Sequence, residues 1–253
     1  MKKVIVLSTA IFAMSCSNVE KAEPTQKEEI TVEETMLKNE SLKTQLDAKK
    51  AAFNAKASEE KKTIYADGIS TVANSGVLSN ALNVGDIAPN FTLTNAKGEE
   101  VTLQDYLAKG PVVLTWYRGG WCPYCNLTLN SLQEALPQFK AEGASLLALT
   151  PEQPDKSMTT KEKNELAFEI LSDVGNNVAR EYGIVYKLTD GVAEIYQDGF
   201  DLHGYNGDES NELPLAATYI IDQTGLIQYA FLDAEYRNRA EPSEIITTLQ
   251  DLQ

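Results

Sequence analysis

The chain has 253 residues, of which 43% are hydrophobic, so it can bury a globular core without disulfide bonds. Its three cysteines exclude a disulfide-rich scaffold, and with a single histidine they are too few for a typical four-ligand structural zinc site. A formal net charge of −15 disfavours nucleic acid and anionic lipid as partners. We therefore expect no metal, no organic cofactor and no nucleic-acid partner.

After a short basic start, Val4–Met14 is an uncharged, mostly apolar run. It is too short for a membrane-spanning helix, which needs about 20 residues, but it suits the apolar part of a signal peptide. Ala13–Cys16 resembles the lipobox of bacterial lipoproteins, in which cleavage before the cysteine leaves it as a lipid-carrying N-terminus. We predict a signal peptide over 1–15, a lipid anchor on Cys16 and a lipidated tether over 16–28.

Two other interpretations of this start remain open: an ordinary signal peptide followed by a chance cysteine, and a transmembrane anchor. The lipoprotein interpretation and the ordinary signal peptide both imply export, so both place the rest of the chain outside the cytoplasm. We expect an envelope protein, either periplasm-facing or an outer-membrane lipoprotein, held to the membrane through its lipid alone. Dithiols become oxidised in that compartment unless a partner reduces them.

Residues 29–81 are predicted to form a helical extension. Large apolar side chains recur at roughly helical spacing through its first part, at Ile30, Leu37, Leu42, Leu46 and Phe53. Ser58 is placed to cap a second helix, whose apolar face holds Ile69 and Val72. Asn74–Gly76 is a stop signal for that helix.

From Gly85 onward, strand and helix patterns alternate, which predicts an α/β sheet. The predicted strands are Phe91–Leu93, Val101–Leu103, Pro111–Trp116, Ala144–Thr150, Phe168–Leu171, Ala217–Ile221 and Leu226–Leu232. The first two should form a hairpin, and so should the last two. The predicted helices run from Cys122 to about Gly143, over Lys156–Glu165 and Asn176–Tyr182, and from about Pro242 onward.

Two polar segments lie outside this alternation. Asp190–Pro214, which is rich in glycine, aspartate and asparagine, is predicted to be an exposed insertion or an active-site loop. Tyr236–Arg239 is a small basic segment near the C-terminus, which we interpret as a solvated turn.

Cys122 and Cys125 follow a predicted buried strand and open a predicted helix, a setting that suits reversible disulfide chemistry. A reactive thiolate is expected at Cys122, because a helix N-terminus presents free N–H groups and favours anions, and because Arg118 lies four residues earlier. Cys125 sits one turn inside the helix and should be better shielded. The exposed Cys122 would then attack, and Cys125 would resolve the adduct.

Pro123 lacks an N–H and fits the first helical turn, while Trp121 and Tyr124 are expected to wall the site. Three other interpretations of the cysteine pair are less consistent with the sequence. Half of a zinc site lacks a second ligand pair, and a structural disulfide between near neighbours would constrain little of the unfolded chain. A papain-like hydrolase would need His203 as its base.

A family pattern is carried by five segments: Asn83–Pro89, Asn90–Leu93, Gly110–Cys125, Val178–Gly183 and Ala217–Asp222. They resemble the peroxiredoxin-like branch of the alkyl hydroperoxide reductase/thiol-specific antioxidant (AhpC/TSA) family. The resemblance implies a thioredoxin-like α/β fold over residues 82–253, with a central mixed sheet flanked by helices, behind the N-terminal helical extension.

The resemblance also implies a peroxiredoxin-type thiol peroxidase. Cys122 would attack a peroxide and become a sulfenic acid, Cys125 would condense with it, and a thioredoxin-like dithiol would reduce the disulfide. The implied partners are thus a peroxide substrate and that dithiol reductant.

Two positions differ from the family pattern. Ordinary peroxiredoxins carry threonine or serine three residues before the attacking cysteine, where Gly119 stands here. Their active-site arginine aligns with Ala216, which leaves Arg118 or Arg180 to supply the positive charge. Thioredoxin-type oxidoreductases have a cis-proline at that late position, and here the nearest proline, Pro214, lies two residues early.

The leading hypothesis is therefore a thiol-dependent peroxidase on an envelope lipoprotein, reducing hydrogen peroxide or organic hydroperoxides. The alternative is a thiol–disulfide oxidoreductase that acts on exported proteins, favoured by the Cys-x-x-Cys pair and by the missing threonine. A third class is a redox-active scaffold that presents residues 29–75 to a partner.

Overall fold

A computed structural model of the protein describes residues 41–252. The predicted signal peptide, the Cys16 anchor and the lipidated tether lie outside these residues. Within the described range, no helix is long and apolar enough to cross a membrane.

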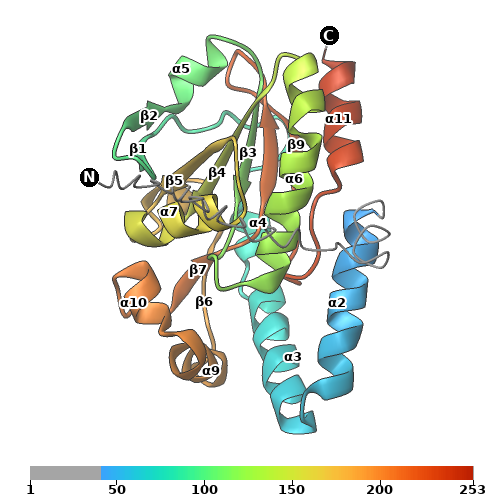
Figure 1. Ribbon diagram of the computed structural model, residues 1–253, viewed down its shortest axis with the longest axis vertical. Coiled ribbons are helices and arrows are strands. Elements are labelled where there is room, and N and C mark those ends of the chain that lie inside the picture. The colour runs from blue at the N-terminus through green and yellow to red at the C-terminus, as the bar shows by residue number, and fades with distance from the viewer. Residues whose placement is uncertain (1–40, 253) are drawn as a thin grey trace, which may run out of the picture. The chain divides into compact units, whose positions relative to one another are not determined.

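A central mixed sheet organises the domain (Figure 1). In the described residues it has seven strands, in the order β2-β1-β5-β4-β3-β8-β9. Their bounds are β1 Thr92–Asn95, β2 Glu100–Thr102, β3 Val112–Trp116, β4 Ser145–Thr150, β5 Glu169–Ser172, β8 Thr218–Ile221 and β9 Ile227–Phe231. β3, β4 and β5 are parallel, whereas β1–β2, β1–β5, β3–β8 and β8–β9 are antiparallel. Both predicted hairpins are present.

β3 has neighbours on both sides and is buried on both faces, which explains its continuous apolar sequence. Val112, Leu114 and Trp116 face one core, and Val113 faces the other. Because β3 is parallel to β4, the chain leaves both strands at the same edge of the sheet. This edge is where open α/β sheets place their sites, and the Cys122 loop begins here.

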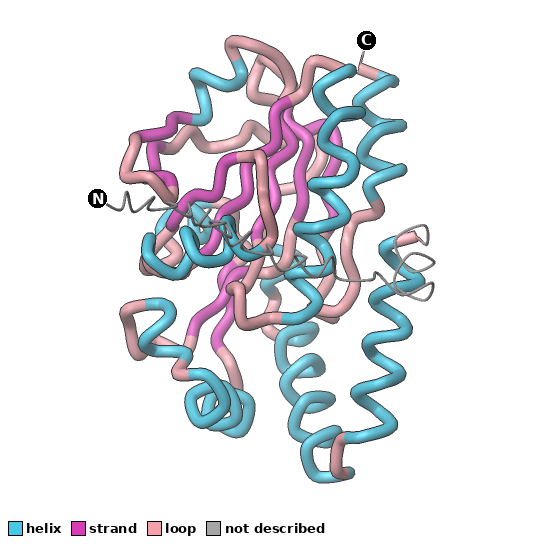
Figure 2. Tube along the Cα trace, in the orientation of Figure 1, coloured by secondary structure: helices cyan, strands magenta, loops and turns pink. Residues whose placement is uncertain are grey.

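Helices cover both faces of the sheet, and Figure 2 shows them as cyan tubes on either side of the magenta strands. One core contains side chains from α3 (Glu59–Asn74), α4 (Val77–Asn80), α5 (Leu103–Leu107), α8 (Asn177–Glu181) and α9 (Asp190–Phe200). The other contains side chains from α2 (Leu42–Lys56), α6 (Pro123–Ala141) and α11 (Pro242–Asp251). α7 (Pro154–Lys163) lies next to β5.

The N-terminal extension forms a helical hairpin, α2 followed by α3, that packs on the domain. Leu42 and Leu46 of α2 are buried in the same core as α6. The predicted cap is present, because the Ser58 side chain accepts a hydrogen bond from the Lys61 N–H at 3.2 Å. Val72 of α3 is buried in the core on the opposite face of the sheet, so the hairpin reaches both cores.

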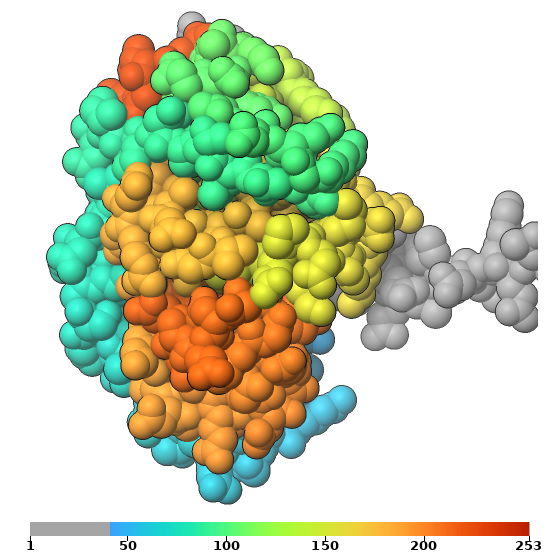
Figure 3. Space-filling view, turned by 90° about the vertical axis from the view of Figure 1, so that its left-hand side faces the viewer, coloured from blue at the N-terminus to red at the C-terminus, as the bar shows by residue number. Residues whose placement is uncertain are grey.

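The prediction of an exposed insertion or loop over Asp190–Pro214 is wrong in detail. This segment folds into α9, α10 (Leu202–Asn206) and β7 (Glu212–Pro214), and β7 pairs with β6 (Val185–Lys187). It forms a continuous surface below α7 in Figure 3, where it is coloured orange. Its glycines and aspartates lie in short helices whose apolar sides pack into the core. The prediction used the polar composition of the segment and overlooked the helical spacing of its apolar residues.

We expect Leu46→Ala to lower the free energy of unfolding by about 2–5 kcal/mol, because it removes a buried side chain that is only 4% exposed. Urea unfolding measures this value. Val84→Ala is the control, since Val84 is 59% exposed, and it should change stability by no more than about 0.5 kcal/mol. Equal effects of the two variants would show that α2 does not stabilise the domain.

Candidate functional site

The loop between β3 and α6 carries the cysteine pair. Cys122 is the N-cap of α6 and Pro123 occupies the first helical turn, as the sequence predicts. The Cys122 N–H donates to the Gly119 carbonyl at 3.0 Å. The Asn126 side-chain amide donates to the Gly120 carbonyl at 2.8 Å, which ties the loop to the helix that it starts.

Gly119 stands where ordinary peroxiredoxins carry a hydroxyl side chain, and the structure gives a physical reason for the difference. Its φ is +152°, in a region that favours glycine. A Cβ on Gly119 would lie 2.2 Å from Nε1 of Trp121. The position of the indole therefore leaves no room for a threonine side chain.

Both sulfurs are buried. Cys122 is 1% exposed and Cys125 is fully buried, and both thiols are free. The expectation that Cys122 is exposed is therefore wrong, because α2 and residues Tyr236–Arg239 pack against the start of α6. Leu42 and Leu46 of α2 belong to the same apolar cluster as the two cysteines.

The pKa values of the two thiols move in opposite directions. Burial raises the pKa of Cys122 well above its usual value, and a hydrogen bond to Cys125 and the charge of that sulfur raise it further. Burial also raises the pKa of Cys125, but the bond from Cys122 and the charges of Arg239 and Arg118 outweigh it and hold this pKa well below its usual value. Arg239 and Arg118 thus favour a thiolate within the pair, and the expected thiolate at Cys122 stays a prediction.

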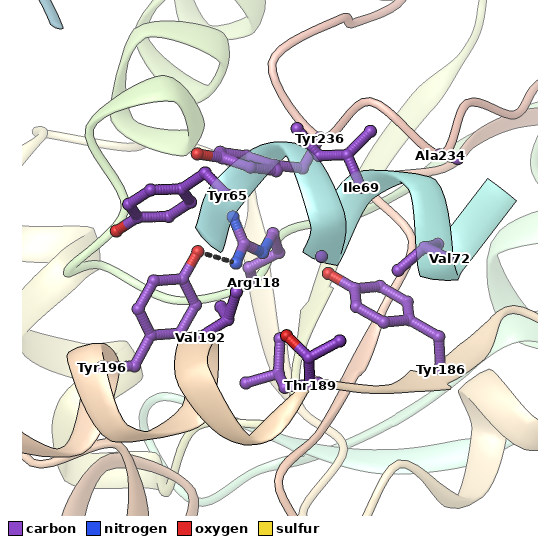
Figure 4. Close-up of a pocket in the computed structure, with 12 residues that line it drawn as sticks. Tyr65, Ile69, Val72, Arg118, Tyr186, Thr189, Val192, Tyr196, Ala234 and Tyr236 are labelled. Atoms are coloured by element: carbon purple, nitrogen blue, oxygen red, sulfur yellow. Dashed lines mark hydrogen bonds between the residues drawn. The ribbon is translucent and has the colours of Figure 1, made fainter. Parts of the chain in front are cut away.

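Arg118 is 1% exposed and lies within a group of aromatic rings (Figure 4). Its guanidinium carbon is 4.1 Å from the ring centre of Tyr236, 5.1 Å from that of Trp121 and 5.2 Å from that of Tyr196. Its Nη2 donates to the Tyr196 hydroxyl at 2.5 Å. Nε and Nη1 have no hydrogen-bond partner and are buried.

The predicted wall residues flank this cation. Trp121 stacks on Phe200 of α9, with ring centres 4.2 Å apart and planes inclined by 15°. Tyr124 meets Tyr236 edge to face, with ring centres 5.7 Å apart. Trp121 and Tyr124 thus line different sides of the site, and Pro123 continues into α6.

The interpretation of Tyr236–Arg239 as a solvated turn is wrong. Arg237 and Arg239 are 9% and 8% exposed, and Nη2 of Arg239 lies 3.4 Å from Sγ of Cys125. Arg237 pairs with Glu235 at 2.7 Å. Two nearby arginines in a chain this acidic could have indicated a functional position. The contact between Arg239 and Cys125 joins residues 114 positions apart in the sequence, so the sequence does not predict it.

The other candidates lie elsewhere. Arg180 is half-exposed and pairs with Glu212, so it does not supply the site's charge. His203 Nε2 is 2.9 Å from Asn211 Oδ1, away from the cysteines, which removes the base that a papain-like hydrolase would need. No peptide bond in residues 41–252 is cis. The same range holds no cluster of histidine, cysteine and carboxylate side chains able to bind a metal.

Glu152, which follows β4, is a site residue that the sequence did not indicate. Its side chain is fully buried, and its Oε1 accepts the Gly120 N–H at 2.8 Å. Burial raises the pKa of this carboxyl from 4.5 to about 7, against the Gly120 hydrogen bond, and the charge of Cys125 adds to the shift. Glu152 is thus a titratable group that holds the loop before the cysteines through its hydrogen bond with Gly120.

Comparison with known proteins decides the family. The AhpC/TSA family model matches residues 84–230, which include the cysteine pair and the sheet from β1 to all but the last residue of β9. The chain belongs to the AhpC/TSA family. The predicted family is therefore confirmed, and the α2–α3 hairpin lies outside the matched region.

Relatives agree with this assignment. Peroxiredoxin Q of Oryza sativa subsp. japonica is 29% identical over 185 residues, 73% of each protein. The thiol-disulfide oxidoreductase ResA of Bacillus cereus is 27% identical over 132 residues, 52% of this chain and 74% of ResA. The structure of peroxidoxin BcpB from Mycobacterium tuberculosis superposes with a TM-score of 0.55 at 19% identity, over 68% of this chain and 99% of that one. The predicted thioredoxin-like fold and the peroxiredoxin-type oxidoreductase class are confirmed.

We expect Glu152→Gln to stabilise the protein at pH 8. The carboxyl binds its proton more tightly when folded, so its contribution is present below about pH 4.5 and is lost as the pH rises through about 7. The shift corresponds to about 3 kcal/mol above pH 7. Glutamine keeps an acceptor for the Gly120 N–H and has no charge to bury.

Urea unfolding at pH 5 and pH 8 measures this difference. Glu152→Gln should gain stability over wild type at pH 8, and the gain should shrink at pH 5. Glu162→Gln on α7, where the side chain is exposed, is the matched control and should show no such pH dependence. A gain that is equal at both pH values would contradict the buried ionisable carboxyl.

Proposed function

We propose that the protein is a thiol peroxidase in which Cys122 reduces a hydroperoxide and Cys125 resolves the product as an intramolecular disulfide. One observation carries the proposal: two buried free thiols, whose pKa values the charge of Arg118 lowers, accompany a buried Arg118 with two unpartnered N–H donors. Membership of the AhpC/TSA family supports the same chemistry.

The reaction begins with a proton shift within the pair. Transfer of the proton along the hydrogen bond from Cys122 to Cys125 leaves a thiolate on Cys122, whose charge Arg118 favours. Arg239 and Arg118 both act on the pair, so its negative charge remains compensated whichever sulfur carries it. The two arginines thereby make the shift possible inside an apolar cluster.

The Cys122 thiolate then attacks the terminal oxygen of the hydroperoxide. A sulfur–oxygen bond forms, the oxygen–oxygen bond breaks, and water or an alcohol leaves with the substrate's proton, so Cys122 becomes a sulfenate. A proton taken up from solvent converts the sulfenate to the sulfenic acid. Nε and Nη1 of Arg118 are the free donors available to the peroxide oxygens as charge develops on them. Cys125 next attacks the Cys122 sulfur, so the disulfide forms and water leaves.

An external dithiol closes the cycle and becomes a disulfide itself. A thioredoxin-like protein is the proposed reductant, with the electrons moving through a mixed disulfide. Both cysteines are buried in the reduced protein, so a protein reductant needs the start of α6 to become accessible. We therefore assign the slower half-reaction to reduction.

A thiol–disulfide oxidoreductase acting on exported proteins is the second candidate. The ResA relative and the Cys-x-x-Cys pair favour it. Burial of Cys122 favours the peroxidase, because a protein disulfide needs a sulfur at the surface, whereas a small peroxide does not. Reduction of insulin disulfides by the reduced protein, without peroxide consumption, would favour the second candidate.

We expect Cys122→Ser to abolish peroxide consumption in the presence of dithiothreitol. Cys125→Ser should still form the sulfenic acid, because the attacking sulfur is intact, and a dione reagent should label that variant at residue 122. Mass spectrometry locates the label. Labelling of Cys122→Ser at residue 125 would reverse the proposed roles, and unchanged turnover in Cys122→Ser would exclude the mechanism.

We expect Arg118→Met to lower the second-order rate constant for peroxide by about 10²-fold, because it removes the donors facing the developing charge. Stopped-flow tryptophan fluorescence follows the reaction, since Trp121 adjoins Cys122. Arg180→Met is the matched control, because Arg180 pairs with Glu212 at the surface. Equal losses in the two variants would show that the loss does not come from the charge at the site.

A further inference from the structure

An open groove of about 510 Å³ lies between the α2–α3 hairpin and the start of α6. One side of it is formed by the end of α2 and the beginning of α3, and the other side by Pro123 and Tyr124. Figure 1 shows that the hairpin extends past the start of α6. Pro123 is exposed and directly follows Cys122 in the chain. The surface of the groove therefore begins one residue from Cys122.

Lysines give this groove a charge opposite to that of the chain. Lys49, Lys56 and Lys61 line it, and all three are exposed. No acidic side chain is among the described residues that line it. The whole chain has a formal net charge of −15, so this lysine groove is a local exception. A positive surface on an acidic protein attracts a partner whose own surface is negative.

The lysines of the groove also differ from the other lysines of the hairpin. α2 and α3 contain six lysines. Within residues 41–252, the three that line the groove form no ion pair. The other three each bind a carboxylate: Lys43 binds Asp47, Lys50 binds Glu235 and Lys62 binds Glu59. The unpaired positive charge that the described hairpin carries is therefore confined to the groove.

Aromatic rings connect the lysine groove to the candidate site. Phe53 of α2 lines the groove and meets Tyr65 of α3 edge to face, with ring centres 5.4 Å apart. Tyr65 lies 6.5 Å from Tyr236, measured between ring centres, and Tyr236 meets Tyr124 on the other side of the groove. Aromatic and apolar surface with charged groups around it is typical of a protein–protein interface. These rings favour a protein as the occupant.

Resting on the proposed peroxidase function, we propose that the lysine groove is the docking site of the reductant, a dithiol protein with carboxylates around its reactive cysteine. Both cysteines of the pair are buried, and α2 is one of the elements that cover them. A reductant held in the groove contacts α2 and the first turn of α6. These are the elements that must separate before its sulfur reaches the disulfide.

The exchange of electrons is a thiol–disulfide exchange. A thiolate of the reductant attacks one sulfur of the Cys122–Cys125 disulfide, the bond between the two sulfurs breaks, and a mixed disulfide forms. The second thiol of the reductant then displaces the sulfur of this protein. The reductant leaves as a disulfide, and its two protons pass to the cysteine pair. The groove lysines take no part in these steps and act by holding the reductant.

Two synthetic peptides probe the charge of the groove. Both contain the same Cys-Gly-Pro-Cys dithiol, one flanked by glutamates and the other by lysines, and diamide first converts the protein to its disulfide form. Tryptophan fluorescence gives the second-order rate constant for reduction by each peptide. The triple variant Lys49→Gln, Lys56→Gln, Lys61→Gln should lower the ratio of the acidic to the basic rate constant by about 10-fold at low salt. Added salt should lower the wild-type ratio toward that of the variant.

A matched variant controls for the charge of the whole chain. Lys97→Gln, Lys109→Gln, Lys140→Gln removes the same charge at exposed positions outside the groove and should keep the wild-type ratio. An equal fall in both triple variants, or no fall in the groove variant, would overturn the docking site. Reduction by dithiothreitol without reaction of either peptide would overturn it too, because the groove would then bring no dithiol to the pair.

The same variants separate this proposal from the proposed function. If hydrogen peroxide fails to oxidise the reduced protein, the peroxidase is overturned, whereas a charge-dependent peptide ratio leaves the groove as a docking site for a dithiol protein. Vesicles of phosphatidylglycerol test the other anionic surface open to such lysines. Sedimentation of the wild type but not of the groove variant with these vesicles, together with equal peptide ratios, would assign the groove to a membrane and overturn the proposal.

Discussion

The burial of the Arg118 guanidinium is the constraint on which the site depends. An arginine keeps its charge in a protein, and burying that charge without compensation is strongly unfavourable. In a chain with 37 acidic residues a carboxylate partner would be easy to supply, yet Arg118 is surrounded by tyrosine and tryptophan rings. Ring faces stabilise the cation without neutralising it, so its positive potential stays available to an anion.

That anion is provided by the sulfurs. The charges of Arg239 and Arg118 lower the pKa of both buried thiols and so oppose the effect of the apolar cluster around them. Arg239 contacts Cys125 directly, with its Nη2 3.4 Å from the sulfur. The helix N-terminus at Cys122 also favours a negative charge there.

Sequence patterns predicted the sheet well because the burial of a strand is visible in the run of apolar residues within that strand. Val112–Trp116 is apolar throughout since both faces are covered, and the turns at the two hairpins have their own residue signals. The cysteine spacing likewise predicted a pair at the start of a helix, where the structure places it. Burial was not predictable, because it comes from α2 and from Tyr236–Arg239, which reach the start of α6 only in the folded chain.

α2 and Tyr236–Arg239 cover the two cysteines, and this burial affects both the oxidation and the reduction proposed for them. Burial raises the pKa of Cys122, and in the proposed cycle it would also limit the access of a second peroxide to the sulfenic acid. The same cover hinders a protein reductant, whose own sulfur must contact the disulfide. In the proposed cycle, disulfide formation would remove any thiolate charge from the pair and with it the attraction of Arg239 and Arg118. Loss of that attraction would favour opening of the start of α6 at the stage when the proposed reductant needs it.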